Sequence, residues 1–239
     1  MSLTATYRLG TRLFWRDRAM LFGSVVTPVG LAVGMPALMR QVMPDGVAAA
    51  TSIFQSTIAL LLSITAFMNI TVALTSRRDQ LVLKRLRASR LTDGQILTGQ
   101  IAGTATQTLA LIVLCTVAVR FVAGVPLPAD PLAYAAVTVA GSAVLSLLGA
   151  AYTAAIPRAE LSAAFTMPVF LVAGVSAGAM GPIPLPSWLV PALDLLPTTA
   201  VVNAVKTGDL AMPFAVLAAW GVAGLVAIRL WFRWEPRRS

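Results

Sequence analysis

Residues 47–90 read VAAATSIFQSTIALLLSITAFMNITVALTSRRDQLVLKRLRASR, and this stretch decides the fold. Residues 47–76 carry no charged side chain, whereas residues 77–90 carry six basic ones. A helix rises about 1.5 Å per residue and the hydrocarbon core of a bilayer is about 30 Å thick, so roughly 20 apolar residues span it. The uncharged part is longer than that. We therefore expect a spanning helix that tilts or projects from the bilayer, followed by a basic segment at the membrane surface.

The rest of the chain has the same character. Its 239 residues are 58% hydrophobic and 11% charged, with a mean hydropathy of +0.83, far outside the range of soluble domains. There is no strand-like alternation that would indicate a barrel. We predict an all-α polytopic membrane protein, a single domain over residues 1–239. Its six transmembrane helices are expected at residues 19–39, 47–76, 95–119, 132–157, 161–180 and 210–228.

The distribution of Lys and Arg predicts the orientation, because these residues accumulate in cytoplasmic loops. With the N-terminus inside, fifteen of them lie on the cytoplasmic side, and only Arg40, Arg120 and Lys206 lie on the other. We expect both termini to be cytoplasmic. Topology then accounts for most of the net charge of +9, and no nucleic-acid partner is needed to explain it.

The first eighteen residues are predicted to form an interfacial helix. Arg8, Arg12 and Arg16 recur every four residues and form one stripe of such a helix, while apolar side chains cover its other faces. The apolar run that follows is about twice as long as the core of a signal peptide, which argues against cleavage.

The basic segment contains two local signals. Residues 78–87 can form about three turns of helix, and Thr92-Asp93-Gly94-Gln95 matches the capping box that begins a new helix. The pattern therefore predicts a short helix, a break and a freshly capped membrane helix. Two interpretations are open: the charges set the orientation and bind anionic lipid, or the short helix contacts a soluble partner.

Transport by an ion gradient is poorly supported by the residues present. The chain has no histidine, and its predicted spans contain no acidic residue away from an end, so a proton relay lacks its usual groups. The sequence also lacks a Gly-rich phosphate loop that ends in Gly-Lys-Ser or Gly-Lys-Thr. We expect no enzymatic activity of this chain, and energy for any pumping must come from another polypeptide.

Uncharged polar residues and glycines within the spans are further candidates for function. The polar residues form interhelical hydrogen bonds or line a substrate path, and the path candidates are Gln55, Asn69, Gln100 and Gln107. Three Gly-x-x-x-Gly pairs allow close approach of helices: Gly30/Gly34, Gly99/Gly103 and Gly174/Gly178.

The segment of residues 77–91, with Gln95-Ile96-Leu97-Thr98-Gly99-Gln100 after it, resembles the loop after the second membrane helix of type-2 ABC exporter permeases. Permeases of this size in the daunorubicin-resistance-like, multidrug branch have six helices with both termini inside. The resemblance covers the layout of the whole chain. Two positions depart from the pattern: Arg90 stands in place of a turn proline, and Leu81-Val82 stands where Gly-Thr is often found.

The resemblance implies that the loop of residues 77–91 is a coupling helix that docks into a separate ABC ATPase subunit. The docking residues would be Arg78, Asp79, Leu83, Lys84, Arg85, Leu86 and Arg87. ATP and Mg²⁺ would bind that subunit, and this chain would bind no cofactor. A second permease copy or a paralogue would complete the transporter, with Gly30, Gly34, Gly174 and Gly178 as the dimer contacts.

It further implies an exporter in the bacterial inner (plasma) membrane that moves a drug or lipid-like substrate outward by alternating access. The proline-rich residues 181–205 would form re-entrant helices at the outer face. The alternative is a non-transporting interaction or scaffold protein whose basic loop binds anionic lipid or a regulator.

Overall fold

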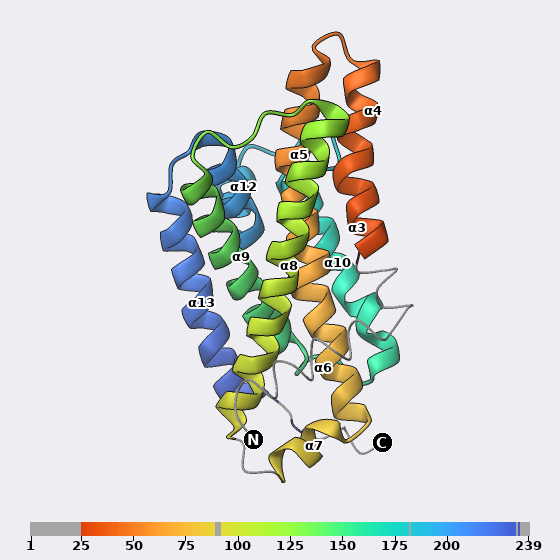
Figure 1. The fold of residues 1–239 in the computed structure, drawn as a ribbon. Coiled ribbons are helices and arrows are strands. Elements are labelled where there is room, and N and C mark those ends of the chain that lie inside the picture. Colours follow the sequence, from red (N-terminus) through yellow and green to blue (C-terminus); the bar gives the residue numbers. More distant parts are fainter. Residues whose placement is uncertain (1–24, 89–91, 182, 233, 235–239) are drawn as a thin grey trace.

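The structure is a computed structural model that describes residues 25–88, 92–181, 183–232 and 234. Over these residues the chain is an elongated bundle of helices, and it contains no strand (Figure 1). Five helices are long and apolar enough to cross a membrane. They are Gly46–Asp79, Asp93–Ala123, Pro131–Tyr152, Ala159–Ser176 and Ala211–Trp231. These helices correspond to the last five of the six predicted segments.

The first predicted segment is described only in part. From residue 25 it is helical as α3 (Thr27–Val29), the π-helix η2 (Gly30–Gly34) and α4 (Met35–Val42). Its beginning and the predicted interfacial helix of residues 1–18 lie outside the described residues. A sixth span therefore stays a prediction, and so does the position of both termini.

The second segment forms the centre of the bundle. It is one continuous helix made of α5 (Gly46–Leu62), the π-helix η3 (Ser63–Met68) and α6 (Asn69–Asp79). Within its most apolar window 72% of the residues are buried inside the protein, compared with 17% for α13 (Ala211–Trp231). The central helix therefore packs mainly against protein, whereas α13 presents most of its surface outward.

Local sequence explains where the next helices begin. In α8 (Asp93–Ala123), the Thr92 hydroxyl accepts from the Gln95 N–H while the Gln95 side chain accepts from the Thr92 N–H, which confirms the predicted capping box. In α9 (Pro131–Tyr152), Asp130 caps the first turn and Pro131 occupies its first position.

The remaining helices are shorter. The chain continues with η4 (Ala159–Leu161), α10 (Ser162–Ser176), α11 (Val190–Asp194) and α12 (Pro197–Thr207) before α13. The proline-rich region thus contains two short helices, of which α12 packs on α5, α9 and α13. Re-entry of these helices into a membrane stays a prediction.

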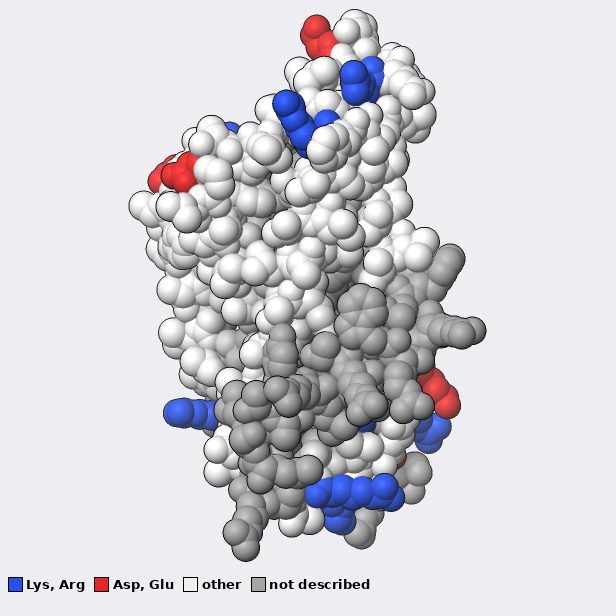
Figure 2. All heavy atoms as spheres, viewed as in Figure 1, with Lys and Arg blue, Asp and Glu red and all other residues white. Residues whose placement is uncertain are grey.

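The bundle has two distinct ends, which we call the α7 end and the α12 end. The short helix α7 (Val82–Arg87) lies at one end, and α12 lies toward the other with the turn between α4 and α5 (Figure 1). On the face seen in Figure 2, described Lys and Arg side chains lie toward the ends, and much of the described surface between them is uncharged. This is the pattern of a protein that crosses a bilayer.

Candidate functional site

The corner between α6 and α7 breaks the single helix expected over residues 78–87. Helix α6 ends at Asp79, and α7 begins only at Val82. Between them Leu81 adopts a left-handed conformation, with φ 59° and ψ 15°. This conformation costs a residue with a side chain about 1–2 kcal/mol, whereas glycine adopts it freely. The expectation of an unbroken helix was wrong, and the break falls at Leu81, where the resemblance described above implies glycine.

Arg78 lies inside the protein at this corner, with 2% of its surface exposed. Its guanidinium group donates to three backbone carbonyls in the loop after α9. The distances are 3.1 Å from Nη1 to the Thr153 oxygen, and 2.9 and 3.1 Å from Nη2 to the oxygens of Ile156 and Pro157. A buried charge is tolerated only when its donors are satisfied in this way.

Asp79 completes this arrangement. Its Oδ1 lies 3.3 Å from Nε of Arg78, and its Oδ2 accepts from the backbone N–H of Ala159 at 2.6 Å. We call Arg78, Asp79 and the loop of residues 153–159 the Arg78–Asp79 clamp. The clamp joins the end of α6 to the end of α9 and to the start of η4 and α10.

Helix α7 is anchored by its apolar side. Leu83 is 1% exposed and packs in a cluster with Ile70, Leu74, Ile96, Leu97 and Ala150, with Leu86 at the edge of the cluster. Lys84 and Arg85 lie on the exposed side of the same helix. Arg87 ends the helix, and its side chain is outside the described part.

The predicted docking set therefore divides in two. Arg78 and Leu83 are buried within this chain, and Asp79 is engaged with Ala159, so these residues hold α7 in place. The side chains of Lys84 and Arg85, by contrast, are exposed at the surface.

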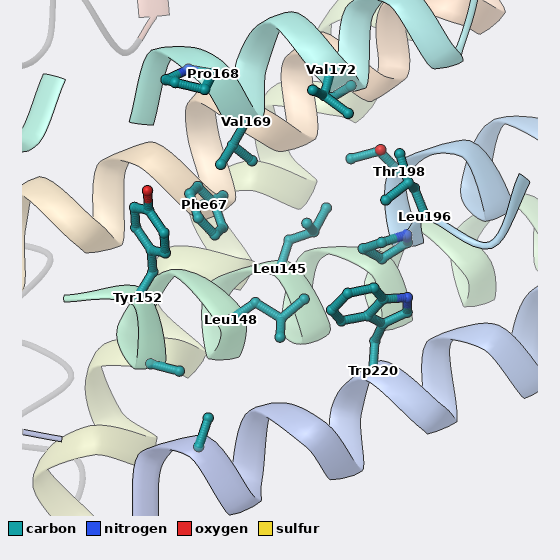
Figure 3. Close-up of a pocket in the computed structure, with 14 residues that line it drawn as sticks. Phe67, Leu145, Leu148, Tyr152, Pro168, Val169, Val172, Leu196, Thr198 and Trp220 are labelled. Carbon is teal, nitrogen blue, oxygen red and sulfur yellow. The ribbon is translucent and has the colours of Figure 1, made fainter. Parts of the chain in front are cut away.

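An apolar cavity of about 470 Å³ lies between α9, α10, α12 and α13, and we call it the apolar groove (Figure 3). It is lined by Phe67, Leu145, Leu148, Ala151, Tyr152, Pro168, Val169, Val172, Ala173, Leu196, Pro197, Thr198, Trp220 and Ala227.

The aromatic side chains at the apolar groove keep their polar atoms engaged elsewhere. Trp220 Nε1 donates to the Leu195 carbonyl at 2.7 Å, and the Tyr152 hydroxyl donates to the Phe165 carbonyl at 2.9 Å. The groove thus offers ring faces and aliphatic groups, and its volume is that of a small-molecule site. It fits hydrocarbon or aromatic parts of a ligand.

A second cavity of about 480 Å³ lies at the α12 end, and we call it the polar cavity. It is lined by residues of α5, α8, the loop before α9, α9 itself and α12, among them Gln55, Asp130, Tyr134 and Lys206. Lys206 Nζ donates to the Ser56 hydroxyl at 2.8 Å and lies 3.5 Å from the Ala177 carbonyl oxygen. Partial burial lowers the pKa of Lys206, because it disfavours the charged form.

The four polar residues predicted to line a path do not lie together. Gln55 lines the polar cavity. Gln100 is buried, and Asn69 and Gln107 are half-buried, and these three line neither the apolar groove nor the polar cavity.

The glycines predicted as dimer contacts also divide. A Cβ atom at Gly30 or Gly34 would meet nothing within 4 Å, so both face outward from the first helix. At Gly174 it would lie 2.7 Å from Met180 Cε and 2.9 Å from Leu60 Cδ2, so this glycine serves packing inside the chain. Gly178 has φ 73° in the turn after α10.

The apolar groove and the Arg78–Asp79 clamp were not foreseen from the sequence. The sequence did carry a signal for the α6–α7 corner, because the resemblance implies glycine at position 81, and glycine adopts the left-handed conformation freely. The uniformly apolar helices around the groove gave no comparable signal.

A comparison with protein-family models places most of the chain in a known family. The family is described as ABC-2 type transporter, and its model matches residues 2–208. A search of curated proteins finds no match. The matched residues include the α6–α7 corner, the whole Arg78–Asp79 clamp, and all the described helices before α13.

Proposed function

Because the chain belongs to the ABC-2 type transporter family, we propose that it is the permease half of an ATP-driven exporter of hydrophobic or amphipathic molecules. Membership of the family makes the chain a multi-pass membrane permease component of an ABC transporter, which is a transport subunit. In the proposed complex, ATP and Mg²⁺ bind a separate ATPase subunit. The chain works beside a second permease copy or a paralogue in the bacterial inner (plasma) membrane.

The proposed ATPase-docking surface is the exposed side of α7, with Lys84 and Arg85 as contacts and Arg87 following them. The observation that carries this proposal is the position of α7, a short basic helix at the very end of the bundle (Figure 1). Its apolar side is fixed by Leu83, so a force on the exposed side moves the bundle rather than α7 alone. Exposed cations of this kind suit an acidic or polar cleft on a soluble subunit.

The proposed substrate class rests on the apolar groove. Its lining is aliphatic and aromatic, and Figure 3 shows Phe67, Leu145, Leu148 and Trp220 arranged around it. A drug or lipid-like molecule has an apolar body of matching chemistry. Among the path candidates, Gln55 lines the polar cavity, which offers room for a polar group of the substrate.

The proposed contact with the second permease uses the first helix. Gly30 and Gly34 leave a smooth, outward-facing strip, which lets another helix approach closely. Gly174 is set aside as a contact because it packs against Leu60 and Met180 of its own chain.

The test is affinity purification of the full chain from native membranes, with mass spectrometry for a phosphate-loop ATPase. We expect the ATPase to co-purify with the native chain and to be lost from the double variant Lys84→Glu, Arg85→Glu. The matched control is Arg229→Glu, a charge reversal on the exposed last turn of α13, which should retain the ATPase. Absence of any ATPase from the native chain would favour a scaffold that binds anionic lipid.

A further inference from the structure

We propose that the Arg78–Asp79 clamp transmits motion from the ATPase-docked α7 to α10, so that Arg78 and Asp79 are positioning residues of the transport cycle. This inference rests on the proposed function. It assigns the two residues a role inside the permease, in place of contact with the ATPase.

The first step is the rigidity of the link between α6 and the end of α9. The guanidinium of Arg78 is planar and always charged, and its donors engage three carbonyls of residues 153–157 together. Opening this contact would leave the Nη donors of a buried guanidinium without partners. The end of α9 therefore follows any movement of Arg78.

The second step is the close packing of α6 on α9. The Thr71 hydroxyl lies 3.0 Å from the Gly149 carbonyl oxygen, and a Cβ atom at Gly149 would lie only 2.5 Å from the Phe67 oxygen. The backbones of the two helices are therefore in direct contact at Gly149. With the clamp below this contact, α6 and the end of α9 are joined at two levels.

The third step is the connection to α10. The Asp79 carboxylate accepts from the Ala159 N–H at 2.6 Å, and Ala159 is the first residue of η4, which leads directly into α10. A carboxylate is favoured at the start of a helix, where N–H groups point outward. Asp79 thus holds the beginning of α10 against the corner that carries α7.

The last step places the apolar groove at the far end of this connection. Pro168, Val169 and Val172 of α10 form one wall of the groove, as Figure 3 shows. A displacement of α10 changes the shape of that wall. The clamp therefore connects the docking surface on α7 with the cavity that we assign to the substrate.

The experiment detects movement of α10 at the apolar groove through the accessibility of a cysteine placed there. It therefore needs no identified substrate. Cys115, which is the sole cysteine and is buried, is first replaced by Ala, and Val172→Cys is added as the reporter, since Val172 is 47% exposed. The rate of maleimide labelling is measured on the purified complex with its ATPase, without nucleotide and after trapping with ATP and vanadate. With the native clamp, we expect trapping to change the labelling rate.

The decisive variant is Ala159→Pro, which removes the backbone N–H that donates a hydrogen bond to the Asp79 carboxylate. Proline is tolerated at the first position of a helix, and Arg158 before it is extended (φ −138°, ψ 151°), the conformation that proline requires of its predecessor. We expect the ATPase to co-purify as before. The ratio of the labelling rate after trapping to the rate without nucleotide should become about one. Ala159→Ser keeps the N–H and should behave like the native chain. Asp79→Ala removes the acceptor without touching the backbone and should reproduce Ala159→Pro.

The outcomes separate the two proposals. If no ATPase co-purifies with the native chain, the proposed function fails and takes this inference with it. If the ATPase co-purifies but Ala159→Pro and Asp79→Ala keep the native response to nucleotide, only the clamp inference is overturned. A reporter that ignores nucleotide in the native complex also overturns it, because α10 then does not move.

Discussion

Arg78 at the α7 end and Lys206 at the α12 end are both cations withdrawn from water, and the protein compensates them differently. Arg78 is almost fully buried and has a carboxylate and three carbonyl oxygens as partners. Lys206 is partly buried, and the oxygens it contacts are the neutral ones of Ser56 and Ala177.

The difference shows which end of the bundle is fixed and which is adjustable. Four oxygens from two elements hold Arg78, so the α7 end cannot rearrange without exposing charge. Lys206 makes hydrogen bonds that water can replace at small cost. An alternating-access transporter needs both properties, with a stiff end to receive force and a loose end to open. Three measurements test this contrast.

The largest expected effect comes from removing each cation in turn. Arg78→Met leaves Asp79 and three buried carbonyls without their donor, and we expect a loss of about 3 kcal/mol in the free energy of unfolding. Lys206→Met should cost at most about 1 kcal/mol, because its partners are neutral. At about 2–4 °C per kcal/mol, Tm in detergent should fall by about 6–12 °C in the first variant and by no more than about 4 °C in the second.

The control for this pair is Arg229→Met on the exposed surface of α13, which should leave Tm nearly unchanged. Equal losses at Arg78 and Lys206 would contradict the contrast between a fixed and an adjustable end.

The next effect is a gain of stability at the α6–α7 corner. Leu81→Gly relieves the cost of the left-handed conformation, and Leu81 is 43% exposed, so little buried apolar surface is lost. We expect Tm to rise, with a gain of about 1 kcal/mol. Gln80→Gly is the matched control: Gln80 has an ordinary φ of −79°, and glycine there should destabilise the protein. A fall in Tm for Leu81→Gly would show that the corner is not strained.

The smallest effect is a dependence of stability on pH that originates at Lys206. Burial lowers the pKa of Lys206 in the folded state, so in the window between this pKa and its ordinary value the unfolded chain binds more protons. Stability then rises with pH in that window and is unchanged by Lys206 below it. The difference in Tm between native chain and Lys206→Met should therefore shift in favour of the native chain as the pH rises from neutral toward the ordinary lysine pKa of about 10.4. A constant difference would mean that Lys206 is as solvated as in the unfolded chain.

Local signals in the sequence were sufficient for much of the fold. Charge-free length predicted the five long helices, and Thr92 with Gln95 predicted the start of α8, because both depend on neighbouring residues alone. The burial of Arg78 could not be predicted in the same way. Its partners Thr153 and Ile156 lie more than seventy positions away, and no periodicity reports such a contact.

The apolar groove was beyond sequence reasoning for another reason. A helix that is apolar all round has no distinct face, so its pattern does not show which side lines a cavity and which meets lipid. Leu145 in α9 and Trp220 in α13 belong to such helices, and their place at the groove depends on how the helices are packed.

The π-helix η3 changes the helical phase of everything that follows it in the central helix. Gln55 and Asn69 are fourteen positions apart, which in a regular α-helix brings two side chains to nearly the same face. A π-turn accommodates about one extra residue and so rotates the later part by about 100°. Gln55 lines the polar cavity, whereas Asn69, about 21 Å further along the helix axis, does not. Deleting one residue between Ser63 and Met68 would remove the π-turn and leave thirteen α-helical steps of about 100° between the two amides, so their relative orientation would stay as it is.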